Sequence, residues 1–238
     1  SYLVEESFRR VRTALRVTRS LAEGDDVDPA AAEMGNRARI AEGLLALRGG
    51  NNRTAIESFS GIRTDSILVP QGLYLLGIAR ARAGNMHRAL QTWRRIGSFP
   101  VAYPGVAEAR IARVWAHRQQ GRPSQALSIT EANRTFLKEA ITDLEALMGR
   151  VHNKGAAQVI RSRLARDQKL IEFLRAGRNI SRSSTMAWFF RFVETGGTVE
   201  DVGEAMDRDF LAFLDSQEKL LRSFKDRSLQ QKAVLFES

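Results

Sequence analysis

The stretch that decides the fold is Gly-Asn-Asn-Arg-Thr-Ala at residues 50–55, which returns as Gly-Asn-Met-His-Arg-Ala at residues 84–89. The alanines that end the two stretches, Ala55 and Ala89, are 34 residues apart. A period of this length is typical of helix–turn–helix repeats, in which each pair of antiparallel helices buries its apolar face against the next pair. The spacing therefore predicts an array of helix pairs.

Two further positions repeat with the same period. An aromatic side chain follows each alanine by four residues, first Phe59 and then Trp93. A glycine precedes each alanine by twelve residues, first Gly43 and then Gly77. Small residues at these points let neighbouring helices approach closely, and we expect the aromatic rings to fill the space between repeats.

A third unit, residues 105–132, is degenerate. It keeps the alanine as Ala126, 37 residues after the previous one, but has Val114 in place of the glycine and Thr130 in place of the aromatic. Terminal repeats drift in this way when one of their faces meets something other than another repeat. Its second helix is expected to continue as one long helix over about 124–148.

The other segments also read as helices, and none alternates apolar and polar residues as a half-buried strand does. We predict an all-α chain with helices over residues 2–21, 30–48, 54–62, 71–83, 86–96, 156–176, 185–194 and from about 198 to 236. The predicted organisation is a leading helix (1–29), about three repeat-type helix pairs (30–132) and a C-terminal helical module (133–238).

The glycine, alanine and aromatic positions together resemble the signature of tetratricopeptide repeats. The residues that carry this resemblance are Gly43, Gly50, Ala55 and Phe59, then Gly77, Gly84, Ala89 and Trp93. It covers about residues 36–132 and implies a tetratricopeptide-like α-solenoid whose first helices line a groove that binds a peptide. By position, the implied groove exposes Arg37, Arg48, Tyr74, Ile78, Arg82, Trp115 and Arg118.

The chemistry of this groove favours an acidic and apolar protein segment. Guanidinium groups bind carboxylates through paired hydrogen bonds, while Tyr74 and Trp115 supply apolar contact area. A clamp for a partner's C-terminal carboxylate, which the family builds from lysine and asparagine, is not expected, because Ile40, Leu44 and Leu75 stand at those positions. We therefore predict a scaffold or adaptor without enzymatic activity. Since the layout resembles bacterial envelope proteins of this family, we expect a subunit of a larger assembly in the periplasm or cell envelope, with the cytoplasm as the alternative.

The positive charge is concentrated after the repeats. The chain has a net charge of +10, and residues 150–191 hold ten Lys or Arg against two acidic residues. The basic patch comprises Arg161, Arg163, Arg166, Lys169, Arg175 and Arg178. It can be a solvated face, a surface for an acidic protein or for the anionic lipids of a membrane periphery, or, as the alternative function, an RNA-binding region. Self-association through the long terminal helices is a further possibility.

Composition excludes several kinds of chemistry. The chain has no cysteine and no apolar run of about eighteen residues that could span a membrane. It begins at Ser1 without signal-peptide features, which we read as a processed or trimmed start. The three histidines lack metal-binding spacing and are expected on helix surfaces: His87, His117 and His152. No phosphate loop or nucleophile elbow is present, so we expect no enzyme, metal or cofactor.

A run of aromatic residues at 188–192, Trp-Phe-Phe-Arg-Phe, is the last notable feature. Consecutive aromatics cannot all face one core from a single helix. We expect the run to be buried on several sides by the last helices, with an exposed docking patch as the alternative.

Overall fold

The computed structural model describes residues 11–20 except 12 and 19, and residues 29–166, 184–197 and 204–236. Within these ranges every regular element is a helix and no strand is present, which confirms the all-α prediction. The chain divides into two compact units, residues 1–96 (unit 1) and 97–238 (unit 2). Of the predicted leading helix, the described residues 11, 13–18 and 20 are all helical.

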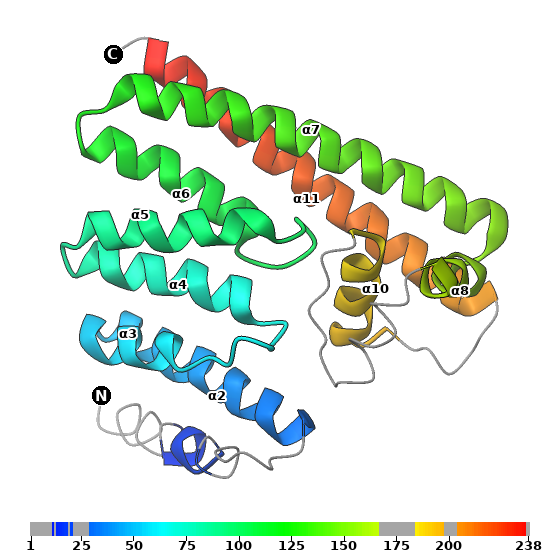
Figure 1. Cartoon of the computed structure of the whole chain (residues 1–238), viewed down its shortest axis with the longest axis horizontal. Coiled ribbons are helices and arrows are strands. Elements are labelled where there is room, and N and C mark those ends of the chain that lie inside the picture. The colour runs from blue at the N-terminus through cyan, green and yellow to red at the C-terminus, as the bar shows by residue number, and fades with distance from the viewer. Residues whose placement is uncertain are drawn as a thin grey trace, which may run out of the picture. The chain divides into compact units, whose positions relative to one another are not determined.

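Unit 1 consists of two helix pairs, each joined by a tight turn (Figure 1). Their bounds are α2 (Pro29–Arg48), α3 (Asn52–Ser60), α4 (Val69–Arg82) and α5 (Met86–Arg95). Each end lies within two residues of its predicted position. Consecutive helices pack against each other, α2 on α3, α3 on α4 and α4 on α5. This is the arrangement expected when each pair covers the apolar face of the next.

The turns inside the helix pairs share one geometry because glycine ends the first helix each time. Gly50, Gly84 and Gly121 have φ angles of +74°, +80° and +66°, a conformation that glycine adopts without a steric penalty. The amide of the next residue then donates to a carbonyl five residues earlier, as in a Schellman motif, at 2.8 Å, 2.8 Å and 2.9 Å in the three turns. In unit 1 that next residue is Asn51 or Asn85, whose side chain caps the second helix.

The repeated glycine and aromatic positions lie against each other. A Cβ atom on Gly43 would overlap the ring of Phe59, and one on Gly77 would overlap the indole of Trp93. Both rings are buried, and Nε1 of Trp93 donates to the Tyr74 carbonyl at 3.1 Å. Each glycine thus makes room for a ring from the second helix of its own pair, so the aromatic fills space within the pair.

Unit 2 contains the third helix pair and the C-terminal helices. The 3₁₀ helix η1 (Ile96–Ser98) lies at the division between the units, and the α-helices are α6 (Val106–Gln119), α7 (Pro123–Lys154), α8 (Ala156–Arg166), α10 (Ser184–Glu194) and α11 (Glu204–Phe236). The division at Ile96 differs from the boundary that the repeat pattern places at residue 132. The third pair belongs to unit 2 because α7 continues beyond repeat length and packs along α11.

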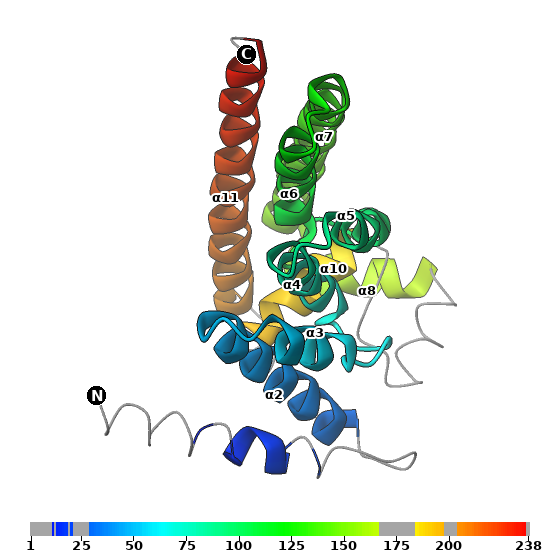
Figure 2. The same ribbon diagram turned by 90° about the vertical axis from the view of Figure 1, so that its left-hand side faces the viewer.

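The two long helices α7 and α11 run side by side in opposite directions and form the main packing of unit 2, and α6 lies along a similar direction (Figure 2). Buried positions on α7 recur at intervals of three or four residues, which places them along one side of the helix. They include Thr130, Asn133, Leu137, Leu144, Leu147 and Val151. This stripe of buried positions continues past Gly149 to Val151. The helix therefore extends to Lys154, whereas the predicted end is at about residue 148. The buried stripe of α7 packs against α11, while Leu220 and Leu229 of α11 stay exposed.

The aromatic run is part of the core of unit 2, which confirms the burial expected for it. Trp188 and Phe192 are buried, and Phe189 and Phe190 are half-buried beside the core formed by Ile160 and Met186. The rings also contact Phe210 and Phe213 of α11. The ring pairs are Phe189–Phe210, Phe192–Phe210, Phe192–Phe213 and Trp188–Phe213. The run therefore joins α10 to α11.

His117 is a correction to the sequence analysis. It was expected on a helix surface but is 3% exposed, whereas His87 and His152 are exposed. It lies in the last turn of α6, which packs against both α7 and α11. In addition, the carbonyl oxygen of His117 accepts a hydrogen bond of 2.9 Å from the amide of Arg122, and this bond closes the turn of the third helix pair.

A carboxylate from α11 caps the start of α8. Oδ1 of Asp207 accepts the amide of Ala156 at 2.6 Å, although the two residues are 51 apart in sequence. Gly155, with a φ angle of +76°, brings the chain close to the same carboxylate. We expect Asp207→Ala to destabilise unit 2 by about 1 kcal/mol, because a free helix N-terminus loses its cap. Urea unfolding followed by circular dichroism measures the effect, and the exposed Asp209→Ala variant, expected near wild type, is the control.

Candidate interaction site

The predicted groove residues of unit 1 lie on the first helices of the two pairs. Arg37 and Arg48 of α2 are exposed, and Tyr74 and Ile78 of α4 are half-buried. Arg82, also exposed, donates from Nη1 to the carbonyl of Leu47 at 3.2 Å and so links α4 to the last turn of α2. A cation at this position interacts favourably with the helix dipole. The structure therefore joins the two groove helices at their C-terminal ends.

Apolar side chains accompany the arginines on α2. Met34 is 60% exposed and Leu44 is 43% exposed. Together with Arg37 and Arg48 they recur at intervals of three, four or seven residues, which places them on one helix face. This face combines positive charge with apolar area.

The other two predicted groove residues, Trp115 and Arg118, lie on α6 of unit 2. Both are exposed, and Trp115 has 44% of its surface accessible. Large exposed aromatics of this kind are common at sites of protein contact. They form a candidate surface of unit 2 in their own right.

The predicted basic patch is described in part. Arg161 and Arg163 are exposed on α8, and Arg166 is the last residue of that helix. Lys169, Arg175 and Arg178 lie outside the described residues. The two described arginines are two positions apart, so they point to different sides of the helix.

A cationic cluster that the sequence analysis missed lies between α4 and α5. Nη1 of Arg80 donates to Oγ1 of Thr92 at 2.5 Å, and Arg88 and Arg95 of α5 lie close enough to act on Arg80 electrostatically. Burial lowers the pKa of Arg80, and the positive charges of Arg88 and Arg95 lower it further. We call Arg80, Arg88 and Arg95 the arginine cluster.

The arginine cluster borders a cavity of about 230 Å³ in unit 1. Arg80 and Arg95 line it, together with Thr64 from the loop between α3 and α4. The rest of the wall is mainly apolar, from Phe59, Ile62, Val69, Leu73 and Leu76. A cavity with an apolar wall and two guanidinium groups fits an occupant that is itself part apolar and part anionic.

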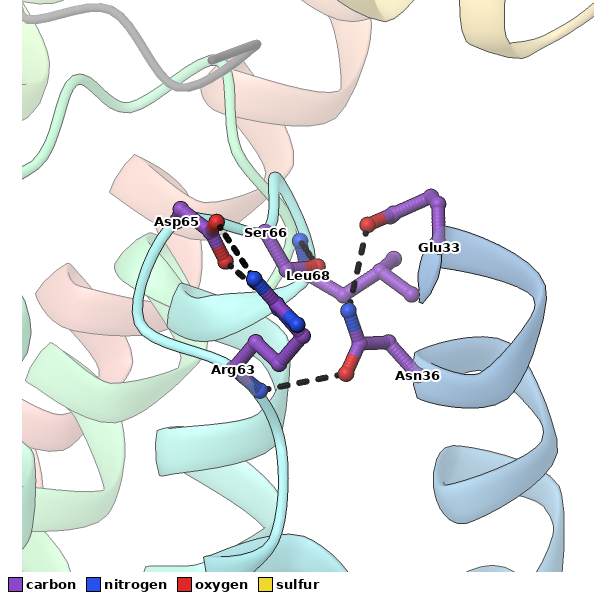
Figure 3. A network of polar contacts seen from close by, with 6 residues as sticks. All are labelled: Glu33, Asn36, Arg63, Asp65, Ser66 and Leu68. Atoms are coloured by element: carbon purple, nitrogen blue, oxygen red, sulfur yellow. Dashed lines mark hydrogen bonds and ion pairs between the residues drawn. The ribbon is translucent and has the colours of Figure 1, made fainter. Parts of the chain in front are cut away.

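A polar network holds the loop that forms one wall of this cavity (Figure 3). The buried side chain of Asn36 on α2 accepts the amide of Arg63 at 3.1 Å and donates to Glu33 at 3.3 Å. Arg63 pairs with Asp65 through two contacts of 3.3 Å, and the Ser66 hydroxyl accepts the amide of Leu68 at 3.0 Å.

The network fixes the loop between α3 and α4 at several points. The exposed Arg63–Asp65 pair contributes little to stability, so the buried Asn36 contact is the one that anchors the loop. Ile62 and Thr64 are thereby held at the cavity. A preformed wall of this kind lowers the entropic cost of binding an occupant.

One signal in the sequence marks the arginine cluster. Residues 66–107 contain no aspartate or glutamate, yet they contain five arginines: Arg80, Arg82, Arg88, Arg94 and Arg95. A helix pair with cations and no carboxylates of its own cannot neutralise itself.

Unit 2 holds a half-buried arginine of its own. The guanidinium carbon of Arg110 lies 3.5 Å from the ring centroid of Phe136, a cation–π contact between α6 and α7. Burial lowers the pKa of Arg110 to about 10, with a smaller effect from Arg113, so it stays charged at neutral pH. Asn133 donates to the Arg110 carbonyl at 3.0 Å. We assign this group to the packing of α6 on α7.

No group of three or more His, Asp or Glu side chains in the described ranges is placed to hold a metal ion. None of the helices within those ranges combines the length and apolar character that crossing a membrane requires. A hollow of about 400 Å³ along α7 is lined by residues of that helix alone, so no second element shapes it.

Comparisons with family models, curated protein sequences and solved structures gave no match to this chain.

Proposed function

We propose that this protein is a non-enzymatic interaction scaffold that holds a segment of a partner protein along its repeat helices. The observation that carries the proposal is the exposed face of α2, on which Arg37 and Arg48 alternate with Met34 and Leu44. Exposed apolar area interleaved with guanidinium groups is suited to a protein segment that is both apolar and acidic.

The packing of unit 1 supports this proposal. Two helix pairs with the same turn geometry and the same glycine–aromatic contact form a rigid support, and Arg82 ties α4 to the end of α2. A support that is already ordered lowers the cost of binding. The tetratricopeptide-like groove and a role in a larger envelope assembly are parts of the proposal.

The groove is tested with the double variant Tyr74→Ala, Arg82→Glu. We expect it to lose at least about tenfold in partner affinity, because it removes an aromatic contact and reverses a charge. The partner is first identified by affinity capture from the native organism with mass spectrometry, and its affinity for each variant is then measured by isothermal titration calorimetry. Circular dichroism checks that the helix content is unchanged.

The matched control is Arg94→Glu, which makes the same charge reversal at an exposed position of α5. It is expected to bind the partner almost as well as the wild type. Equal binding by the double variant and the wild type would place the site elsewhere. Capture of RNA instead of protein, with affinity that falls steeply as salt rises, would contradict the scaffold proposal.

A further inference from the structure

One side of α6 carries a short pattern of side chains that is complementary to itself. Glu108, Ile111, Trp115 and Arg118 follow one another at intervals of three, four and three residues, which places them along one side of the helix. Trp115 and Arg118 are exposed, and Glu108 and Ile111 are half-buried. The buried residues of α6 lie on its other sides, and the helix packs against α7 and α11. We call these four residues the α6 face.

The two charged residues of the α6 face lie at its opposite ends. Glu108 is in the first turn of α6, where its Oε2 accepts the amide of Gly105 at 3.0 Å. A carboxylate has two oxygens that each accept hydrogen bonds, so this cap leaves the second oxygen available. Arg118 is in the last turn, and it takes part in no ion pair within the described ranges. The face thus ends in a carboxylate on one side and a guanidinium on the other.

The centre of the α6 face is apolar. Trp115 has 44% of its surface accessible, whereas the other two tryptophans of the chain, Trp93 and Trp188, are 1% and 2% exposed. A large aromatic side chain that stays accessible is typical of a protein contact, because its burial there contributes much of the affinity. Ile111 lies one turn before Trp115 and extends the apolar area. The two side chains form an apolar contact surface between opposite charges.

Two copies of α6 that lie side by side in opposite directions would match all four residues at once. About a two-fold axis level with residue 113, Glu108 lies opposite Arg118 of the second copy, and Ile111 lies opposite Trp115 of the second copy. Each contact then occurs twice, as an isologous interface requires. The four residues span about 15 Å of helix, a length over which antiparallel helices crossing at about 20° remain in contact.

We propose that this protein forms a homodimer through the α6 face, in which two Glu108–Arg118 ion pairs flank an apolar centre made of Ile111 and Trp115 from both copies. The charge pattern selects a second copy as the occupant. Opposite charges at equal distances from one point are what a two-fold axis requires, whereas an unrelated partner requires no symmetry in this face. The inference goes beyond the proposed function and does not rest on it, because it concerns α6 alone.

The dimer is expected to be weak and reversible. α6 has 14 residues and is about 21 Å long, so a contact along one pair of such helices buries less than the roughly 1,200–2,000 Å² of stable complexes. Exposed ion pairs contribute little to affinity. They do set the direction of pairing, because like charges would face each other if the two helices were parallel. Most of the affinity is therefore expected from Trp115.

The test follows the full chain as its concentration rises from micromolar towards millimolar. Sedimentation equilibrium gives the Kd of the dimer, and acrylamide quenching of tryptophan fluorescence reports on Trp115, since Trp93 and Trp188 are already buried. We expect the mass to approach that of two chains while the quenching of Trp115 falls. Trp115→Ala is expected to raise the Kd at least about tenfold. The control Leu220→Ala, Leu229→Ala truncates exposed apolar side chains of α11 and should keep the wild-type Kd.

Two charge reversals test the direction of pairing. Arg118→Glu places a carboxylate opposite Glu108 of the second copy, and Glu108→Arg places a guanidinium opposite Arg118 of the second copy. Each variant alone is expected to dimerise at least about tenfold more weakly, whereas an equimolar mixture of the two should form a mixed dimer in which opposite charges face each other again. Circular dichroism checks the fold. Glu108→Gln, which keeps the capping hydrogen bond and removes the charge, separates loss of the cap from loss of the ion pair.

Several results would overturn the inference. They are a monomer at every concentration, equal Kd values for Trp115→Ala and the wild type, or a mixture of the charge-reversed variants that associates no better than either alone. Loss of the dimer in the Leu220→Ala, Leu229→Ala variant would assign self-association to α11 instead. Protection of Trp115 by phosphatidylserine vesicles, with the protein still monomeric, would assign the face to a membrane surface. The Tyr74→Ala, Arg82→Glu variant is expected to dimerise normally, so failure of the groove and failure of this interface are read separately.

Discussion

Replacing Gly77 with alanine is expected to destabilise unit 1 by about 3 kcal/mol, the upper end of the usual cost of overpacking. The added methyl group would overlap the indole of Trp93, which is 1% exposed. The ring cannot move aside without breaking the bond of 3.1 Å from its Nε1 to the Tyr74 carbonyl. Hydrogen exchange with mass spectrometry measures the effect, because it reports the stability of each unit separately.

Gly49→Ala is the matched control for this variant. A Cβ atom on Gly49 would lie at an ordinary contact distance, 3.5 Å from the Leu45 carbonyl oxygen, and its φ angle is not in the left-handed region. We expect its stability to remain within about 0.5 kcal/mol of the wild type. The double variant Gly77→Ala, Trp93→Phe is expected to cost less than the sum of the single changes, because they share one contact. Additive costs would mean that the glycine does not make room for the ring.

Replacing Phe210 with alanine is expected to destabilise unit 2 by about 3–5 kcal/mol, the usual cost of truncating a buried phenylalanine. Phe210 is 0% exposed, and its ring centroid lies 5.0 Å from that of Phe192 and 6.1 Å from that of Phe189. The substitution would leave a cavity between α10 and α11 and remove these aromatic contacts. The free energy of unfolding is obtained from a urea titration followed by hydrogen exchange in the peptides of unit 2.

The control for Phe210 is Leu220→Ala, which truncates an apolar residue of the same helix that is 45% exposed. We expect a change within about 0.5 kcal/mol. If the Phe210→Ala variant were equally stable, the aromatic run would not form the contact that joins α10 to α11. A larger loss of protection in α10 than in α6 would support the expected location of the damage.

Much of unit 1 could be predicted because its determinants are local or periodic. Gly43 and Gly77 were identified by the 34-residue period, and at both positions the helices approach closely. The rings of Phe59 and Trp93 were expected between repeats, but each packs on the glycine of its own pair. The helix ends followed from glycine and asparagine, whose conformational and capping preferences act over a few residues. The all-α class followed from the periodicity of apolar residues in the same way.

The parts that could not be predicted depend on contacts between distant residues or between helices. Asp207 reaches an amide 51 residues away, and no local pattern indicates that cap. Arg80 and Thr92 face each other only because α4 and α5 pack at a particular rotation. His117 was misplaced because α6 is covered by α11, which lies far along the chain. The cavity depends on the loop that Asn36 anchors, which also has no sequence signature.

The separation between α7 and α11 in sequence has a consequence for the order of folding during synthesis. α11 begins 50 residues after α7 ends, and the ion pair between Glu145 and Arg222 spans 77 residues. Most contacts of unit 1, in contrast, join helices that follow one another directly. We expect α2 to α5 to become protected while the ribosome is still making unit 2, because local contacts close small loops. The apolar stripe of α7 stays uncovered until α11 has been synthesised. During this interval we expect it to be the part of the nascent chain that chaperones bind.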